Sequence, residues 1–467
     1  MKFRAGCVIV GFLSLVLPLP AQTFTTLQSF DSTDGANPEA GLVQGVDGNL
    51  YGTTQQGGAN GAGTVFEITP SGTLTTLYSF CSIGVCTDGD APYAGLAQAT
   101  NGNLYGTTTA GGTHGAGTVF KITSRGVLTT LYSFCSASAC TDGKKPTAGL
   151  VQAANGDFYG TTEIEGAKGD GTIFKITPSG TLTVLYTFCS QPDCADGEGA
   201  SGLVLATNGD FYGTTEGGGA NGDGTVFKIT AAGALTTLHS FDSADGADPL
   251  AGLVQAANGD FYGTTYIGGA NGEGTVYKIT PGGTLTTLYS FCSQSGCPDG
   301  ANPYAGLIQA TDGNFYGTTY AGGANFYGTV FKITPGGTLT TLHSFDDADG
   351  EETLAGLVQA TNGILYGATY AGGADFNGTV FSLSVAGLGP FAETLPTSGK
   401  VGTSVKILGN NLTGTTSVTF NGTAATFTVV SGSEITTTVP TGATSGTVEV
   451  TTSSGTLKSN TKFRVTP

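Results

Sequence analysis

The chain of 467 residues contains no tryptophan, one methionine and only three histidines. It carries 16 lysines and arginines against 34 aspartates and glutamates, without a basic run that could follow a phosphate backbone. We therefore expect no nucleic-acid partner. Beyond the first 22 residues no apolar stretch approaches the roughly 18 residues that a membrane helix needs, so no membrane span is predicted.

Motifs for catalysis and for cofactor binding are missing as well. The chain has no HExxH and no GxSxG motif, and its glycine-rich GGANGAG segment precedes an expected strand instead of a helix. His239 and His343 replace the tyrosine of a repeated LYSF segment, and His114 lies in an expected loop. The sequence thus predicts no catalytic residue, no metal site and no cofactor.

Residues 1–22 have the pattern of a secretory signal peptide. Lys2 and Arg4 precede an apolar run that ends at Pro20-Ala21-Gln22. Cys7 comes before the apolar run, which disfavours a lipoprotein anchor. We expect an exported protein, either secreted or displayed at the cell surface.

The rest of the chain is rich in glycine, with 79 glycines, and it repeats itself. Near-copies of NLYGTT or DFYGTT place equivalent tyrosines at 51, 105, 159, 212, 262, 316 and 366. Each unit contains a GLVQA-type segment, the LYGTT segment, a glycine-rich loop, GTVFKIT, a turn and TLTTLYSF. Apolar alternation and the Asn-Gly turns, such as 101–102, indicate four strands per unit.

A sheet of four strands cannot bury both of its faces alone, but copies packed radially can, which predicts a β-propeller. The first three strands of the unit occur seven times, and no TLTTLYSF follows the last set, which ends at residue 385. The segment TFTTLQSF at 23–30 supplies the missing strand. We therefore expect an all-β chain whose residues 23–385 form a seven-bladed β-propeller closed by its N-terminal strand.

The AGLVQA…LYGTT…GTVFKIT…LTTLYSF pattern resembles the GloVer repeats of bacterial choice-of-anchor tandem repeat proteins. The resemblance covers nearly all of residues 23–385 and implies a secreted or surface-displayed protein, without bringing catalytic residues. Residues 386–467, with Pro396, VTFNG at 418–422 and VEV at 448–450, are similar to an IPT/TIG domain. Their alternating apolar residues and turn spacing independently argue for a small immunoglobulin-like β-sandwich.

Eight cysteines form four local pairs directly after the last strand of a unit. The pairs are Cys81/Cys86, Cys135/Cys140, Cys189/Cys194 and Cys292/Cys297. In an exported chain this regular spacing predicts disulfides. Metal binding would need two further ligands per pair, and none recurs beside them.

An Asp-Gly pair begins the loop between units in all seven repeats. The acidic residues could suggest calcium, most of all in the cluster Asp346, Asp347, Asp349, Glu351 and Glu352. No spacing of a calcium loop is present, however. We favour a turn in which aspartate caps and glycine supplies the positive φ.

Departures from the repeat indicate where a ligand could bind. The candidate contacts are aromatic residues of the last three units: Tyr266, Tyr320, Phe326, Tyr327, Tyr370 and Phe376. Such a cluster can stack on sugar rings or anchor a cell-surface protein, although it can also simply pack over neighbouring strands. Earlier units offer Glu163, Glu165 and Glu216 instead.

Two functions follow from these patterns. The first is a non-catalytic extracellular protein that binds a glycan or a protein partner. The alternative is an extracellular propeller enzyme, a lyase or hydrolase of polysaccharide, because propellers can build active sites around their channel without a sequence motif.

Overall fold

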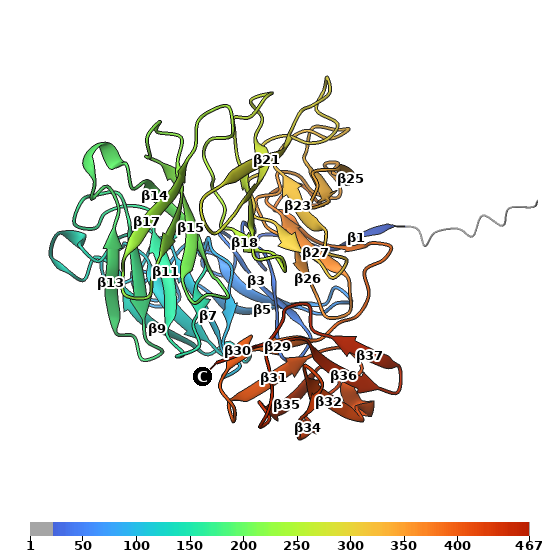
Figure 1. Cartoon of the computed structure of the whole chain (residues 1–467). Helices are drawn as coiled ribbons and strands as arrows, with labels where there is room; N and C mark the ends of the chain where they lie inside the picture. Colours follow the sequence, from blue (N-terminus) through green and yellow to red (C-terminus); the bar gives the residue numbers. More distant parts are fainter. Residues whose placement is uncertain (1–21, 467) are drawn as a thin grey trace, which may run out of the picture.

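The structure, a computed structural model, describes residues 22–466 (Figure 1). These residues form an all-β protein in which the helical segments are the short 3-10 turns η1 (Ser138–Cys140), η2 (Pro192–Cys194) and η3 (Leu412–Gly414). The predicted signal peptide lies outside the described residues, apart from Gln22. Within 22–466, no helix has the length and apolar character required to cross a bilayer.

Seven four-stranded antiparallel sheets repeat along the chain, and we number them 1 to 7 and letter their strands a to d. The a strands are β2 (Val43–Gln44), β6 (Ala97–Gln98), β10 (Val151–Gln152), β14 (Glu198–Leu205), β18 (Val254–Gln255), β22 (Ile308–Gln309) and β26 (Val358–Gln359). The b strands are β3 (Leu50–Thr54), β7 (Leu104–Thr108), β11 (Phe158–Thr162), β15 (Phe211–Gly217), β19 (Phe261–Thr265), β23 (Phe315–Thr319) and β27 (Leu365–Thr369).

The outer two strands of each sheet follow the same order. The c strands are β4 (Thr64–Ile68), β8 (Thr118–Ile122), β12 (Thr172–Ile176), β16 (Thr225–Ile229), β20 (Thr275–Ile279), β24 (Thr329–Ile333) and β28 (Thr379–Ser384). The d strands are β5 (Leu74–Ser79), β9 (Leu128–Ser133), β13 (Leu182–Thr187), β17 (Leu235–Ser240), β21 (Leu285–Ser290), β25 (Leu339–Ser344) and β1 (Thr23–Ser29).

Strand β1 is the d strand of sheet 7, which has the order β1-β28-β27-β26. It pairs antiparallel with β28, from Thr23 opposite Ser384 to Ser29 opposite Thr379. The start of the described chain therefore lies beside the end of the repeat region, as the truncated last repeat indicates. Sheet 7 is built from both ends of this region.

Aromatic rings join each sheet to the next. The phenylalanine directly after a d strand makes a T-shaped contact with an aromatic ring on the following c strand, at centroid distances of 5.1–5.4 Å. The contact between Phe30 of sheet 7 and Phe66 of sheet 1 has the same form as the other six. The sheets thus follow one another with the last packed on the first, which gives the repeat region its propeller-like architecture.

The glycine of each LYGTT segment makes room for this packing. A Cβ atom on Gly52 would lie 2.5 Å from Cζ of Phe66 and 2.7 Å from Cδ2 of Leu42. The bare backbone lets the c-strand ring lie directly across strand b, where both residues are buried. A side chain here would force the sheet apart.

Hydrogen bonds near the centre of the molecule reinforce the junctions. In sheet 1 the Thr53 hydroxyl donates to the carbonyl of Ala94 in sheet 2 at 3.1 Å, and equivalent threonines do the same up to the contact of sheet 6 with sheet 7. Sheet 7 has Ala368 at this position. Its junction with sheet 1 keeps a second bond that recurs at several junctions, in which Oε1 of Gln44 accepts from the Thr361 N–H at 2.8 Å.

The C-terminal residues form two further four-stranded sheets packed around one core. The first has the order β29 (Glu393–Leu395), β31 (Ser404–Leu408), β35 (Glu434–Thr438) and β34 (Phe427–Val429). The second has β33 (Thr423–Ala424), β32 (Ser417–Phe420), β36 (Val448–Thr452) and β37 (Gly455–Lys458), and β30 (Ser398–Gly399) pairs in parallel with β38 (Arg464–Val465). Val405 and Ile435 of one sheet meet Val418 and Val450 of the other in a shared apolar cluster.

This β-sandwich rests against the a–b turns of the repeat sheets (Figure 1). The Ser433 hydroxyl donates to the carbonyl of Val46 in sheet 1 at 2.9 Å, and the Phe391 N–H donates to Thr361 O in sheet 7 at 3.1 Å. The Arg464 guanidinium donates to the carbonyl of Thr207 in sheet 4. The b–c and d–a loops lie at the opposite ends of the strands and remain outside this interface.

Removal of one ring from β1 tests its role in closing the fold. Phe24 stacks on His343 at 3.7 Å and also contacts Phe381, whereas Thr25 beside it is exposed. We expect Phe24→Ala to lower the free energy of unfolding by about 2 kcal/mol, and Thr25→Ala by less than about 0.5 kcal/mol. Chemical denaturation measures both; equal effects of the two substitutions would contradict the packing of β1.

Tyr277 offers a test in the opposite direction. It occupies the position that phenylalanine holds in the other c strands, and its hydroxyl is buried without a hydrogen-bond partner in the described structure. Tyr277→Phe should raise the free energy of unfolding by about 1 kcal/mol, because the desolvated hydroxyl is removed. Tyr51→Phe is the control, since the Tyr51 hydroxyl donates to Asp47 at 2.5 Å and its loss should destabilise the fold. Stabilisation by both changes would point to a cause other than the unpaired hydroxyl.

Candidate functional site

All six predicted aromatic contacts lie in the b–c loops of sheets 5, 6 and 7, on the face opposite the β-sandwich. The structure divides them into an inner and an outer group. The inner group contains the residues that follow the b strands: Tyr266, Tyr320 and Tyr370. The outer group lies further along the loops of sheets 6 and 7: Phe326, Tyr327 and Phe376.

The three inner tyrosines are half-buried, and the side chains of Tyr266 and Tyr320 have partners within the protein. The Tyr266 ring makes a T-shaped contact with Tyr304 at 6.0 Å, and the Tyr320 hydroxyl donates to Oε1 of Glu352 at 2.9 Å. Burial, together with the Glu352 hydrogen bond, raises the pKa of Tyr320 to about 12. These three side chains serve at least partly as packing between sheets.

The outer group faces solvent, and two of its members, Tyr327 and Phe376, line a pocket. Phe326 is 67% exposed and Phe376 is 63% exposed, which is far more than the core aromatics. Tyr327 and Phe376 line a pocket of about 690 Å³ together with Asn325, Asp346, Asp347, Ala348, Ala374 and Ser29 of β1. The pocket therefore bridges sheets 6 and 7.

The backbone beneath the two phenylalanines is unusual for such large residues. Phe326 has φ of 70° and Phe376 has φ of 60°, in the left-handed region. The equivalent position is glycine in the other five repeats, for example Gly222 with φ of 85°. A left-handed conformation costs a residue with a Cβ roughly 1–2 kcal/mol, and the exposed rings regain little of it by packing.

The two aspartates of this pocket differ in whether they form hydrogen bonds within the protein. Oδ1 of Asp346 accepts the N–H groups of Ala348 and Asp349, both at 3.0 Å, and so holds its own turn. In the described part of the chain the Asp347 carboxylate makes no hydrogen bond or ion pair. Asp347 is therefore available to a ligand placed against Tyr327 and Phe376.

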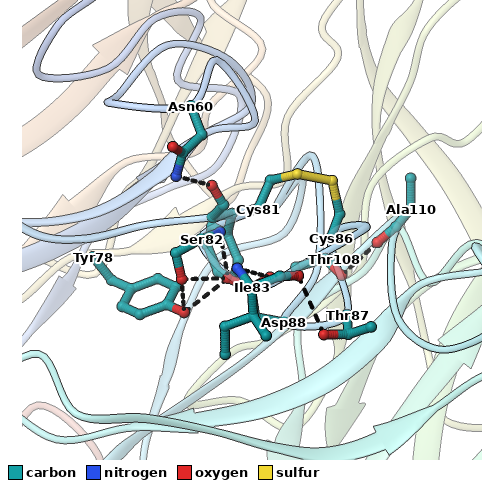
Figure 2. The surroundings of a disulfide bond; sticks show 11 residues. Asn60, Tyr78, Cys81, Ser82, Ile83, Cys86, Thr87, Asp88, Thr108 and Ala110 are labelled. Carbon is teal, nitrogen blue, oxygen red and sulfur yellow. Dashed lines mark hydrogen bonds between the residues drawn. A yellow bond between two sulfur atoms is a disulfide. The ribbon is translucent and has the colours of Figure 1, made fainter.

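The aspartates of the Asp-Gly pairs act as caps of the loops between sheets. Figure 2 shows Asp88, whose Oδ2 accepts from the Ser82 N–H at 2.9 Å and from the Tyr78 hydroxyl at 2.8 Å. In the repeats that have histidine in place of this tyrosine, Nε2 of His239 and of His343 lies 2.8 Å from the corresponding aspartate. Both histidines are thus structural, and the turn interpretation of the Asp-Gly pairs is supported.

The four predicted disulfides are present beside these caps. Cys81–Cys86, Cys135–Cys140, Cys189–Cys194 and Cys292–Cys297 each close a small loop after a d strand (Figure 2). Such bonds indicate an oxidising environment. Among the described residues, one set of three potential ligand atoms lies close enough for a metal, that of Asp170, Cys189 and Cys194, but its two sulfurs are bonded to each other. The acidic cluster at 346–352 forms no such set.

A second cavity, of about 620 Å³, lies where all seven repeat sheets meet. Its wall comes from equivalent residues around each a strand, such as Gly41, Gly95 and Gly306, and from residues directly after the b strands, such as Gln55 and Thr109. The cavity is therefore central, at the strand ends that carry the loops. Its ionisable lining residues are Glu39, Tyr93, Lys145, Glu163, Glu216 and Tyr304.

Two tyrosines from distant repeats meet across this cavity. The hydroxyls of Tyr93 in sheet 2 and Tyr304 in sheet 6 are hydrogen-bonded to each other. Glu39 lies beside them, is only 8% exposed, and its Oε2 has no hydrogen-bond partner in the described structure. Burial raises the pKa of Glu39 to about 7, against the opposing effect of the Tyr93 hydroxyl.

The other charged groups lie on the side of sheets 3 and 4. Nζ of Lys145 and Oε1 of Glu163 form an ion pair at 2.7 Å. Glu216 has no such partner among the described residues, and burial, followed by the neighbouring Glu163 and Asp248, raises its pKa. Of the glutamates that the sequence singles out in these repeats, Glu163 and Glu216 line the cavity and Glu165 does not.

Sequence reasoning missed Glu39, Tyr93 and Tyr304. These residues share one repeat position, directly before an Ala-Gly pair, which is occupied by Thr147, Leu250 and Leu354 in other units. Variation at this position was visible in the sequence. That the position faces a common cavity follows only from the arrangement of the seven sheets.

The raised pKa of Glu39 predicts a pH dependence of stability. Because the folded-state value, about 7, exceeds the ordinary 4.5, this group contributes stability that is fully present below pH 4.5 and is lost as the pH rises through 7. Between pH 4.5 and 7, the free energy of unfolding of the native protein should fall by between about 1 and 3 kcal/mol relative to that of Glu39→Gln. Chemical denaturation at a series of pH values measures the loss. Glu165→Gln should show the same loss as the native protein. Parallel curves of unfolding free energy against pH for the native protein and Glu39→Gln would contradict the prediction.

Comparison with solved structures shows likeness in fold. A fungal alcohol oxidase of the AA5 family, in complex with copper, has 13% sequence identity and a TM-score of 0.52, over 95% of this chain and 99% of that chain. A periplasmic gluconolactonase of Pseudomonas aeruginosa has 19% identity and a TM-score of 0.45, over 65% of this chain and 84% of the other. A putative 6-phosphogluconolactonase of Bacteroides uniformis has 19% identity and a TM-score of 0.44, with the same coverage.

Comparison of sequences identifies the family of the chain but gives it no activity. No curated protein matches the chain. The family model described as the Gloeobacter/Verrucomicrobia repeat matches residues 16–141, 136–298 and 201–438, which together span most of the sequence. The resemblance to these repeats is confirmed, and the IPT/TIG resemblance of residues 386–467 stays a prediction. The chain belongs to the Gloeobacter/Verrucomicrobia repeat family.

Proposed function

We propose that this protein is an exported, non-catalytic binding protein whose outer pocket, between sheets 6 and 7, holds a sugar ring of an extracellular glycan. Residues 1–22 serve as its signal peptide, and the four disulfides support export. Residues 23–385 act as a seven-bladed propeller, and residues 386–467 act as an IPT/TIG-like spacer or second contact module. The pairing of β1 with β28 and the contact of Phe30 with Phe66 support the seven-fold ring.

The observation that carries the proposal is the pair of exposed phenylalanines on a left-handed backbone. A phenylalanine that replaces glycine at such a position destabilises its loop, and exposed strain of this kind is concentrated at functional sites. Phe326 and Phe376 occupy the same position in adjacent repeats. Phe376 lines the pocket, and Phe326 directly precedes the lining residue Tyr327. A ligand that contacts both loops explains the two exposed, strained phenylalanines better than two unrelated substitutions do.

The chemistry of the pocket suits a carbohydrate. Tyr327 and Phe376 supply ring faces for the apolar side of a pyranose, and Asp347 supplies acceptors for its hydroxyl groups. The pocket volume, about 690 Å³, falls in the range usual for small-ligand sites. The open position of the pocket would also admit one residue of a long chain.

Replacing both phenylalanines by glycine tests this function without damaging the fold. Glycine fits the left-handed backbone, so the Phe326→Gly/Phe376→Gly variant should leave the free energy of unfolding unchanged or raise it by about 1 kcal/mol. Its affinity for the bound glycan, selected on a glycan array and measured by calorimetry, should fall at least about tenfold. Val85→Ala is the control, because Val85 is 85% exposed on the same face, outside the pocket.

The same experiment separates the alternatives. Glycan that is bound and recovered intact supports a binding protein, whereas shortened chains would support the polysaccharide-degrading enzyme. Full affinity in the double variant, or no glycan binding by the native protein, would refute the assignment of this pocket. In the latter case a protein partner on the same face becomes the remaining candidate.

A further inference from the structure

The central cavity is separate from the outer pocket, and it is not explained by the scaffold. Its wall includes residues of every repeat sheet, yet its charged and aromatic residues are confined to particular repeats. Glu39 and Tyr93 belong to the first two repeats, and Glu216 belongs to the fourth. A purely structural channel has no need of this asymmetric set.

Negative charge exceeds positive charge in this cavity. Glu39, Glu163 and Glu216 line it together with a single cation, Lys145. The 2.7 Å ion pair satisfies Glu163. Among the described residues, Glu39 and Glu216 form no ion pair, although Lys145 lies near enough to Glu216 to oppose the rise in its pKa.

A buried group without a partner marks the same place independently. Glu39 is more than nine-tenths buried and lines the cavity, and its Oε2 accepts no hydrogen bond in the described structure. An unsatisfied buried carboxylate oxygen is costly unless a ligand completes it. For the ionised carboxylate, the missing partner is a hydrogen-bond donor or a cation.

The arrangement of the carboxylates disfavours a single metal ion. In the described residues, the cavity glutamates do not bring three ligand atoms within 4.8 Å of one another. A divalent cation would need such convergence. Separated carboxylates match a ligand whose positive charges are themselves separated along a chain.

We propose that the central cavity binds an extended organic cation that carries two or more ammonium groups, of the polyamine class. One ammonium group would donate to Glu39 and another to Glu216. The rings of Tyr93 and Tyr304 also line the cavity and favour a cation or its alkyl segments. The cavity volume, about 620 Å³, accommodates such a chain.

The fold leaves one side for entry. The cavity residues lie at the loop ends of the strands, whereas the β-sandwich contacts the opposite turns at Val46, Thr207 and Thr361. Because these turns belong to sheets 1, 4 and 7, the sandwich reaches across that end of the repeat region. A ligand would therefore enter from the loop face.

Spermidine is the probe, titrated calorimetrically into the full-length protein at about pH 8, where Glu39 is ionised. The ionisable groups near Glu39 are Tyr93, Tyr304 and Tyr370, and they stay neutral at this pH because burial raises their pKa values above the ordinary 10. We expect one bound spermidine per chain, with Glu39→Gln and Glu216→Gln each weakening it at least about tenfold. Glu165→Gln, outside the cavity, should bind like the native protein.

Lys145→Gln is expected to strengthen spermidine binding, an effect that misfolding would not produce. Removal of the ammonium frees Glu163, so spermidine should bind several-fold more tightly to this variant. Triethylene glycol, an uncharged chain, should not bind. The proposal is overturned if spermidine does not bind, if binding is unaffected by Glu39→Gln and Glu216→Gln, or if calcium binds with the same dependence on these residues and displaces spermidine.

Discussion

The T-shaped contact between a phenylalanine after strand d and the c-strand ring of the next sheet is the constraint on which the rest of the structure depends. A four-stranded sheet of this composition has two apolar faces, and each can be covered only by another copy. Seven such contacts, all between 5.1 and 5.4 Å, leave no sheet without a neighbour on either side. The glycine of strand b permits the close approach, and β1 provides the final ring, Phe30.

Because the contacts repeat, most residues of the repeat region are committed to the scaffold. The Thr53-type hydroxyl, the Gln44-type side chain and the Asp88-type cap recur with the same partners in most units. Positions that change from unit to unit are therefore the ones free to serve a ligand. Phe326, Phe376, Glu39 and Glu216 are all departures of this kind. The two phenylalanines carry a local cost in backbone strain, and Glu39 carries one in burial.

The two ends of the strands have different roles. The a–b turns receive the β-sandwich, through hydrogen bonds that involve the backbone carbonyls of Val46, Thr207 and Thr361. The loop face carries the disulfides, the outer pocket and the mouth of the central cavity. The glycan assigned to the pocket and the amine assigned to the cavity would thus approach from the same side.

The sequence by itself determined the strands, the four-stranded units and the use of both chain ends in sheet 7, because strand periodicity, turn residues and the truncated last repeat are local or countable features. It also indicated the disulfides and the aromatic loops of sheets 5 to 7. Only the tertiary structure decided that Tyr266, Tyr320 and Tyr370 pack inward while Phe326 and Phe376 stay exposed. It also brought Glu39, Tyr93 and Tyr304 together, since residues up to 265 positions apart line one cavity only through the packing of the repeat sheets.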